Sequence, residues 1–171
     1  MFNKFMQWLV PKLEASLKKK GKYVNIYGHK DSTELYLIRY FLFRSKYFSI
    51  YIHRFMRSDV GDPHDHPFNF LGYVVKGGYI EELWPDPYPY GHYSELSERK
   101  QGSWAWRPAK TTHMVHLDKE RLSEDQQEAP LTIIFRGRQI RDWGFWRWQS
   151  VGRVWVLWHQ YLGIDPSDNK E

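Results

Sequence analysis

Residues 59–67 read Asp-Val-Gly-Asp-Pro-His-Asp-His-Pro and hold the most informative pattern in this chain of 171 residues. The pair His64 and His66 is separated by one residue. Side chains two apart on an extended strand project from the same face, so both imidazoles can reach one metal ion. Histidines that are merely surface-exposed or hydrogen-bonded are commoner than metal ligands, so the pair alone leaves both interpretations open.

A third histidine follows in a specific context. Residues 102–108 read Gly-Ser-Trp-Ala-Trp-Arg-Pro, which predicts a strand between a glycine and a proline, and His113 follows after a turn. Iron, zinc, nickel and manganese all accept imidazole nitrogen, so the ligand type does not choose the ion. The three histidines together favour a divalent-metal site.

The chain from residue 23 onward is typical of an all-β fold. Short stretches rich in Tyr, Val, Ile and Phe alternate with Gly, Pro, Asp and Asn. Such a pattern indicates a sandwich or a closed barrel. The predicted strands are 23–27, 34–43, 47–56, 69–76, 79–84, 103–107, 113–117 and 131–136, and 153–162 is either strand or helix. Residues 85–101 and 118–130 are predicted loops.

The first 22 residues show a helical period. Apolar residues recur at intervals of three and four, at Phe2, Phe5, Met6, Leu9, Leu13 and Leu17. Pro11 would kink this helix unless it opens a second short one, and Gly21 is expected to end it. We interpret 1–22 as a helical segment packed on a single domain, 23–171. Docking on a membrane surface or a partner is the alternative for this helix.

The composition of the chain limits its possible chemistry, location and partners. The chain is 42% apolar, enough for one packed domain, and it has no cysteine, which excludes disulfides, thiolate ligands and a cysteine nucleophile. We see no secretion signal and no apolar run long enough to span a membrane, so a cytoplasmic location is expected. The net charge of +5 is compatible with an anionic partner, including nucleic acid.

The histidine segments resemble the two sequence motifs of the cupin superfamily, G-x5-H-x-H-x3,4-E-x6-G and G-x5-P-x-G-x2-H-x3-N. The matching residues are His64, His66, Gly78, Gly102, Pro108 and His113. The resemblance implies a single cupin barrel, a double-stranded β-helix or jelly roll, that holds a metal on the three histidines. It also implies a small-molecule substrate or ligand.

The departures from the motifs concern the fourth ligand. Leu71 stands where cupins place a ligating glutamate, Lys110 replaces the second-motif glycine, and Leu117 replaces the terminal asparagine. The resemblance therefore implies a three-histidine site, unless a carboxylate such as Glu81 reaches in from a neighbouring strand. Residues 52–59, 64–67, 77–79, 107–109 and 142–145 are also similar to a group of small phage and bacterial cupin-fold proteins. That likeness strengthens the fold expectation and says nothing about the reaction.

Other residues are candidates around the metal. His53 and Asp59 are candidates for holding or orienting a ligand, the alternatives being a core histidine and turn chemistry. Arg107 is the first candidate clamp for a substrate carboxylate or phosphate, with Arg136 and Arg138 after it, the alternative being an ion pair with Asp142, Glu81 or Glu82. The aromatic candidates for substrate contact, or else for the core, are Tyr73, Tyr79 and Trp104. His116 follows His113 by three and is expected on the opposite face of the strand.

The leading functional hypothesis is a metal-binding cupin, most plausibly a non-haem iron oxygenase acting on a small anionic molecule. Fe²⁺ is the first candidate ion, with Zn²⁺, Ni²⁺ and Mn²⁺ as alternatives, and no catalytic residue is assigned. In cupins that resemble this arrangement, three-histidine iron sites support dioxygenases, zinc or nickel versions support isomerases and lyases, and some members only bind ligands.

Three alternatives remain open. A non-catalytic cupin that binds or senses a small ligand is the second hypothesis. A basic protein that binds nucleic acid by stacking and charge is a third, without a motif behind it. A metal-free sugar epimerase would use histidine as its base, but three protonated imidazoles would repel one another. Exposed β edges also make a homodimer plausible.

Overall fold

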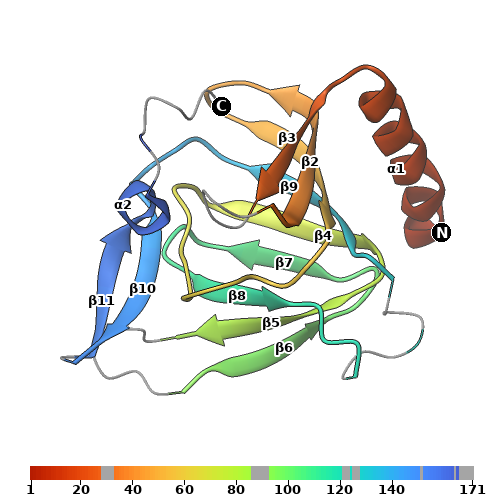
Figure 1. Cartoon of the computed structure of the whole chain (residues 1–171). Coiled ribbons are helices and arrows are strands. Elements are labelled where there is room, and N and C mark those ends of the chain that lie inside the picture. Colours follow the sequence, from red (N-terminus) through yellow and green to blue (C-terminus); the bar gives the residue numbers. More distant parts are fainter. Residues whose placement is uncertain are drawn as a thin grey trace.

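The structure is a computed structural model that describes residues 1–27, 33–85, 93–120, 124, 128–150, 152–163 and 165. It is mostly β, with one long helix near the start and one short helix near the end (Figure 1). The elements are α1 (Phe2–Lys19), β1 (Tyr23–Tyr27), β2 (Leu35–Arg44), β3 (Ser49–Phe55), β4 (Phe70–Lys76), β5 (Tyr79–Trp84), β6 (Glu95–Arg99), β7 (Trp104–Arg107), β8 (Thr112–His116), β9 (Leu131–Arg136), β10 (Gly144–Gln149), β11 (Gly152–Leu157) and α2 (Trp158–Leu162).

The strands form three antiparallel sheets. One has the order β1-β2-β3-β9-β4-β7, a second the order β6-β5-β8, and the third is the hairpin β10-β11. The prediction of a mostly β fold is confirmed, but the predicted closed barrel is not formed, because no ladder among the described residues joins the three sheets. Isolated bridges of His64, in the loop after β3, connect it to His113 of the three-stranded sheet and to Phe145 of the hairpin. Pro63 and Pro67 flank this segment and lack the N–H that a continuous ladder needs.

Every predicted strand exists, with bounds that differ by a few residues. Two strands were missed: β6, which lies inside the predicted loop 85–101, and β10. The stretch 153–162 contains both predicted alternatives, since β11 leads directly into α2. Parts of the two predicted loops, 86–92, 121–123 and 125–127, lie outside the described residues.

Helix α1 covers one face of the six-stranded sheet, at the right of Figure 1. It runs through Pro11 as one helix, and Gly21 follows it with φ 63°. The inward side chains Val10 and Leu17 belong to a core cluster with residues of the sheet, namely Tyr40, Ile52, Tyr73, Val75, Leu131 and Ile133. The main apolar core therefore lies between α1 and this sheet. Neither helix in the described part is long and apolar enough to cross a membrane.

One ion pair fixes the helix to the sheet. Arg54 of β3 donates to both carboxylate oxygens of Glu14, at 2.5 and 2.6 Å, and the Glu14 residue is only 8% exposed. Replacing Glu14 with alanine leaves the half-buried guanidinium without this partner, so we expect a loss of about 1–3 kcal/mol in the free energy of unfolding. Urea titration checks this, with Glu120→Ala on the surface as control. An unchanged midpoint would contradict the anchoring role.

The opposite face of the six-stranded sheet carries polar side chains among buried apolar ones. Ile38, Ile52 and Ile133 pack toward α1, and side chains alternate along a strand. Arg39 on β2 and His53 on β3, which are direct cross-strand partners, therefore face away from α1. A sheet that buries apolar side chains on one face and carries an arginine and a histidine on the other has room for a functional site on the second face.

Candidate metal centre

The structure brings His64, His66 and His113 together. One ring nitrogen of each lies within 4.8 Å of the others, and Nε2 of His66 lies 2.7 Å from Nε2 of His113. Two imidazole nitrogens bound side by side to one ion at about 2.1 Å lie about 3 Å apart. The spacing and the chemistry of these three donors therefore fit a single divalent ion.

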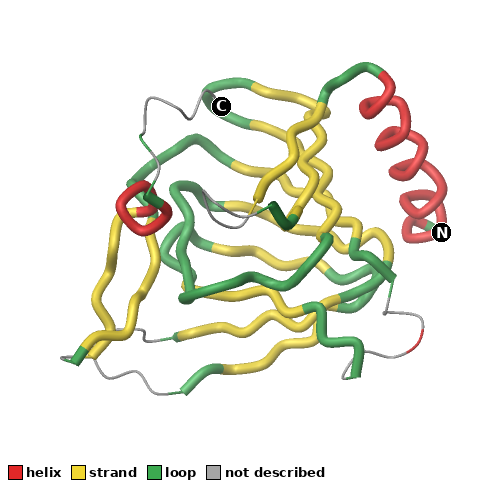
Figure 2. Tube along the Cα trace, viewed as in Figure 1, coloured by secondary structure: helices red, strands yellow, loops and turns green. Residues whose placement is uncertain are grey.

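Backbone hydrogen bonds hold the two histidine segments in register. The β3–β4 loop, residues 56–69, is drawn as green trace in Figure 2 and lies beside β8. The amide of His64 donates to the carbonyl of His113 at 3.1 Å, and the reverse bond is 2.9 Å. The amide of His66 donates to the carbonyl of Ala109 at 3.0 Å. The paired histidines thus sit on an extended loop, in which His64 forms isolated bridges with His113 and with Phe145, and not on a regular strand.

Asp65, between the two histidines, anchors the loop from behind. It is 2% exposed and accepts hydrogen bonds from the amide of Gly144 at 2.8 Å, from Nε1 of Trp155 at 3.0 Å and from Nη1 of Arg141 at 2.7 Å. Because neighbouring side chains of an extended segment alternate, this inward anchor directs His64 and His66 to the other side. The Asp65 carboxylate therefore ties the metal-ligand loop to the β10–β11 hairpin.

We expect Asp65→Asn to lower the free energy of unfolding by about 1–3 kcal/mol, because one oxygen acceptor becomes a donor facing other donors. The backbone that positions His64 and His66 should loosen as well. Thermal unfolding of the variant beside Asp142→Asn, an exposed aspartate before β10, measures the difference. Equal melting temperatures for the two variants would show that Asp65 is not an anchor.

Glu81 of β5 supports His113 from the side away from the other two histidines. Its Oε1 lies 2.8 Å from Nδ1 of His113, and Arg107 donates to both of its oxygens. Burial alone would raise the pKa of Glu81, but the hydrogen bonds from His113 and Arg107 outweigh it and lower the pKa to about 2. The ionised carboxylate accepts a hydrogen bond from the Nδ1–H group of His113. The lone pair on Nε2 of His113 therefore faces the cluster.

The loop histidines are held in the neutral form. Burial lowers the pKa of His64 to about 4. Burial, together with the charges of His113 and His64, lowers the pKa of His66 well below its usual value. Only neutral imidazole binds a metal, so these environments favour the ligating form at neutral pH.

Aromatic rings surround the cluster. Phe70 and Phe68 lie 4.9 and 6.0 Å from the His66 ring, and Phe145 lies 5.5 Å from the His64 ring, between ring centroids. Tyr161 of α2 stacks on Phe145 at 4.0 Å. These rings give the site an apolar wall that limits the access of water and strengthens electrostatic interactions inside it.

His53 and Asp59 lie near the cluster but bond elsewhere. Nε2 of His53 accepts a hydrogen bond from Nε of Arg39 at 3.1 Å, and its ring stacks on Tyr51. Burial and then the charge of Arg39 lower the pKa of His53. Asp59 accepts the backbone N–H of Val115 at 2.6 Å, so it braces the loop against β8. Neither side chain belongs to the converging group of three.

The remaining candidates separate into two groups. Arg107 pairs with Glu81, which is one of the carboxylates considered as its partner, and Tyr79 lies two residues before Glu81 on β5 and contacts Phe55. Tyr73 and Trp104 pack on each other at 4.6 Å on the face of the sheet covered by α1, where Tyr73 donates to Asn3. The last two therefore lie away from the histidines.

A cationic pair, Arg136 and Arg39, lies beside the cluster, and sequence reasoning anticipated only Arg136 of the two. The guanidinium of Arg136 lies 4.9 Å from the ring centroid of Phe68, which stacks on His66, and its Nε donates to the hydroxyl of Tyr51 at 3.0 Å. The charge of Arg39 contributes to the lowered pKa of His66. The available signal was a single charged residue, Arg39, inside the apolar run 35–43.

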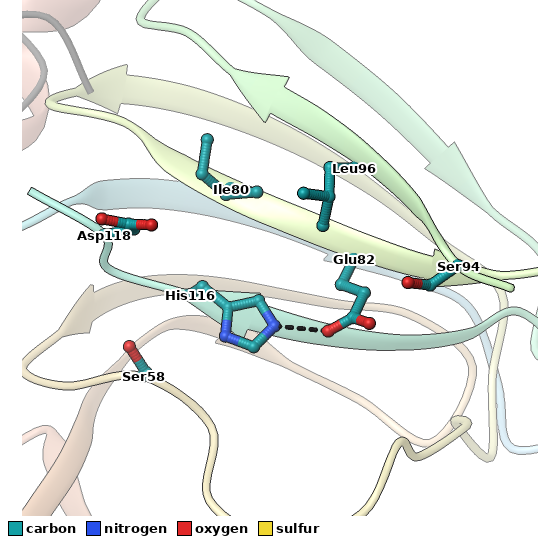
Figure 3. Close-up of a pocket in the computed structure, with 7 residues that line it drawn as sticks. All are labelled: Ser58, Ile80, Glu82, Ser94, Leu96, His116 and Asp118. Carbon is teal, nitrogen blue, oxygen red and sulfur yellow. Dashed lines mark hydrogen bonds and ion pairs between the residues drawn. The ribbon is translucent and has the colours of Figure 1, made fainter. Parts of the chain in front are cut away.

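His116 faces the other side of β8, as its spacing from His113 predicts. Its Nε2 lies 2.7 Å from Oε2 of Glu82 in a surface groove of about 580 Å³ (Figure 3). The groove residues are Ser58, Ile80, Glu82, Ser94, Leu96, His116 and Asp118. This arrangement makes His116 a matched control for His113, on the same strand and outside the metal cluster.

The chain matches no family model and no curated protein. Among solved structures it is similar to KdgF from Halomonas sp., at 21% identity over 67% of this chain and 96% of that one, with a TM-score of 0.44. It is also similar to an RmlC-like cupin from Shewanella frigidimarina, at 16% identity over 68% and 93% of the two chains, with a TM-score of 0.42. It is similar as well to Fe(II)-HppE, at 11% identity over 68% of this chain and 56% of that one, with a TM-score of 0.47.

Proposed function

We propose that this chain is a divalent-metal-binding protein of the cupin type, and that its metal site acts on a small anionic molecule as a non-haem iron oxygenase. The observation that carries the proposal is the convergence of three ring nitrogens from His64, His66 and His113 within 4.8 Å. Fe²⁺ is the first ion to test, before Zn²⁺, Ni²⁺ and Mn²⁺.

The protein groups around the histidines have separable tasks. His64, His66 and His113 would hold the ion, and three neutral ligands would leave it its full charge and open coordination positions, on which dioxygen or a chelating anion can bind. Glu81 orients His113 and fixes its tautomer. The aromatic wall of Phe68, Phe70 and Phe145 keeps bulk water away.

The charges beside the cluster favour an anionic substrate. Arg107 is neutralised by Glu81 and Arg141 is paired with Asp65. Arg136, in contrast, forms no ion pair with a carboxylate within the described part of the chain. It donates a hydrogen bond to the Tyr51 hydroxyl and lies over the rings of Tyr51 and Phe68. A half-buried guanidinium of this kind can receive a carboxylate or phosphate in bidentate fashion.

The experiment is oxygen consumption by the Fe²⁺-loaded protein with a panel of small carboxylates, phosphates and thiols. We expect turnover with at least one anion, and Arg136→Gln should raise its KM by roughly tenfold or more, because a charge-assisted hydrogen bond is lost. Arg138→Gln, an exposed neighbour, is the control. The oxygenase proposal fails if no compound in a broad panel stimulates oxygen uptake, and the anion proposal fails if the two arginine variants behave alike.

The second candidate is a non-catalytic cupin that binds or senses a small ligand. It is favoured by Leu71, which takes the place of the motif glutamate and pairs in the ladder with Trp106 and Phe135. A small molecule that is recovered unchanged from the purified wild type, and is absent from the purified Arg136→Gln variant, would support this reading. Conversion of that molecule by the metal-loaded protein would exclude it.

A further inference from the structure

The outer face of α1 is aromatic. Phe5 and Trp8 are 52% and 56% exposed, although their neighbours Met6, Val10 and Leu13 already pack on the core. Beside the start of the helix, Phe2 stacks on Trp104 of β7, an edge strand of the six-stranded sheet. We define the aromatic face as Phe2, Phe5, Trp8, Trp104 and Trp106, each at least 45% exposed. Five large rings gathered on one exposed surface mark an interaction site rather than ordinary scattered surface residues.

The same helix carries only positive charge on its exposed side. Its lysines are Lys4, Lys12, Lys18 and Lys19, with Lys20 and Lys22 directly after it. The single acid of α1, Glu14, points inward and is bound by Arg54. The ammonium of Lys12 lies 3.7 Å from the ring centroid of Trp8, so cation and aromatic ring form one continuous surface.

We propose that this face docks the protein on an anionic lipid surface, with α1 lying flat in the membrane interface. Aromatic side chains prefer the boundary between headgroups and acyl chains, and lysines bind anionic headgroups while their stems lie along the apolar boundary. A second copy of the chain fits less well, since a symmetric contact through this face would bring the same lysines together. The metal cluster is on the other face of the six-stranded sheet and stays available in the docked protein.

The test is co-sedimentation of the full chain with vesicles of phosphatidylcholine alone and of phosphatidylcholine mixed with phosphatidylglycerol. We expect binding to be roughly tenfold or more stronger on the anionic vesicles, and to weaken as salt is added. The variant Trp8→Ser/Lys12→Gln should lose roughly tenfold or more of this binding. Circular dichroism and melting temperature confirm that the variant is folded.

The matched control is Trp148→Ser/Lys110→Gln, which also removes one exposed tryptophan and one exposed lysine and changes the net charge equally. Trp148 lies on β10, at the left of Figure 1 and far from α1. This control should bind like the wild type. Equal losses in both variants, or no binding to anionic vesicles at low salt, would overturn the proposal. Capture of single-stranded DNA or self-association through Trp8 and Lys12, without vesicle binding, would also overturn it and assign the face to that partner.

Discussion

Replacing His66 with alanine is expected to lower the affinity for a divalent ion by more than about a hundredfold. Even residues that only orient a metal ligand change affinity by about 10–100-fold, and His66 is placed to supply one of the three donor atoms itself. The variant should stay folded, since its backbone bond to Ala109 is unaffected. Competition titration with a chromophoric chelator measures the affinity for Zn²⁺ or Fe²⁺.

The control for this experiment is His116→Ala. His116 lies on β8 with His113, but its imidazole bonds Glu82 on the outer face of the sheet. Its removal should leave metal affinity unchanged within experimental error. If His66→Ala and His116→Ala bind the ion equally well, the three converging nitrogens do not form the site.

Replacing Glu81 with alanine should produce two effects at once. Loss of the carboxylate leaves Arg107 without its partner in a site where its side chain is only 14% exposed, so we expect a loss of about 3–5 kcal/mol in the free energy of unfolding. Loss of the bond to Nδ1 of His113 should also lower metal affinity by about 10–100-fold.

Two further variants separate these effects. The double variant Glu81→Ala/Arg107→Ala removes the charge of Arg107, so part of the lost stability should return. Arg99, 3.8 Å from Glu81, still loses this partner, and the metal affinity should stay low. Glu82→Ala, one residue away on the outer face, should change neither quantity strongly. Chemical unfolding gives the stability and chelator competition gives the affinity. A Glu81 variant with wild-type metal affinity would remove its proposed role in orienting His113.

The three histidines could be anticipated because their positions depend on short-range rules. Alternation along an extended segment directs His64 and His66 to one side and separates His113 from His116 on β8. These rules tolerate local irregularity, which explains why the pair still converges although it lies on a loop with isolated bridges at His64 alone.

Which face of a sheet each residue occupies could not be read from the sequence, because it depends on contacts across layers. Tyr73 and Trp104 were expected as substrate contacts or core, and the position of α1 places Tyr73 in the core and leaves Trp104 partly exposed beside it. The sequence offered three carboxylates as possible ion-pair partners of Arg107. Only the packing of β7 near β5 shows that the partner is Glu81. The same long-range packing places Arg136 beside Phe68.

Of the two missed strands only β6 is weakly apolar, since β10 reads Gly-Phe-Trp-Arg-Trp-Gln. β6 reads Glu-Leu-Ser-Glu-Arg and is an edge strand of the three-stranded sheet, so it lacks the apolar alternation of a half-buried strand. β10 ends in three exposed residues and is stabilised chiefly as a hairpin with β11. The barrel expected from the cupin resemblance is not closed, because no ladder among the described residues joins the three sheets. In the loop after β3, Pro63 and Pro67 lack the N–H that a continuous ladder needs, and only isolated bridges form there.

The most direct test of the central claim is the metal content of protein purified without chelator or affinity tag, measured by mass spectrometry beside the His64→Ala/His66→Ala variant. The account predicts close to one equivalent of iron, zinc, nickel or manganese in the wild type and almost none in the variant. A folded wild type that carries no metal and takes up none from a Fe²⁺ or Zn²⁺ solution would contradict it.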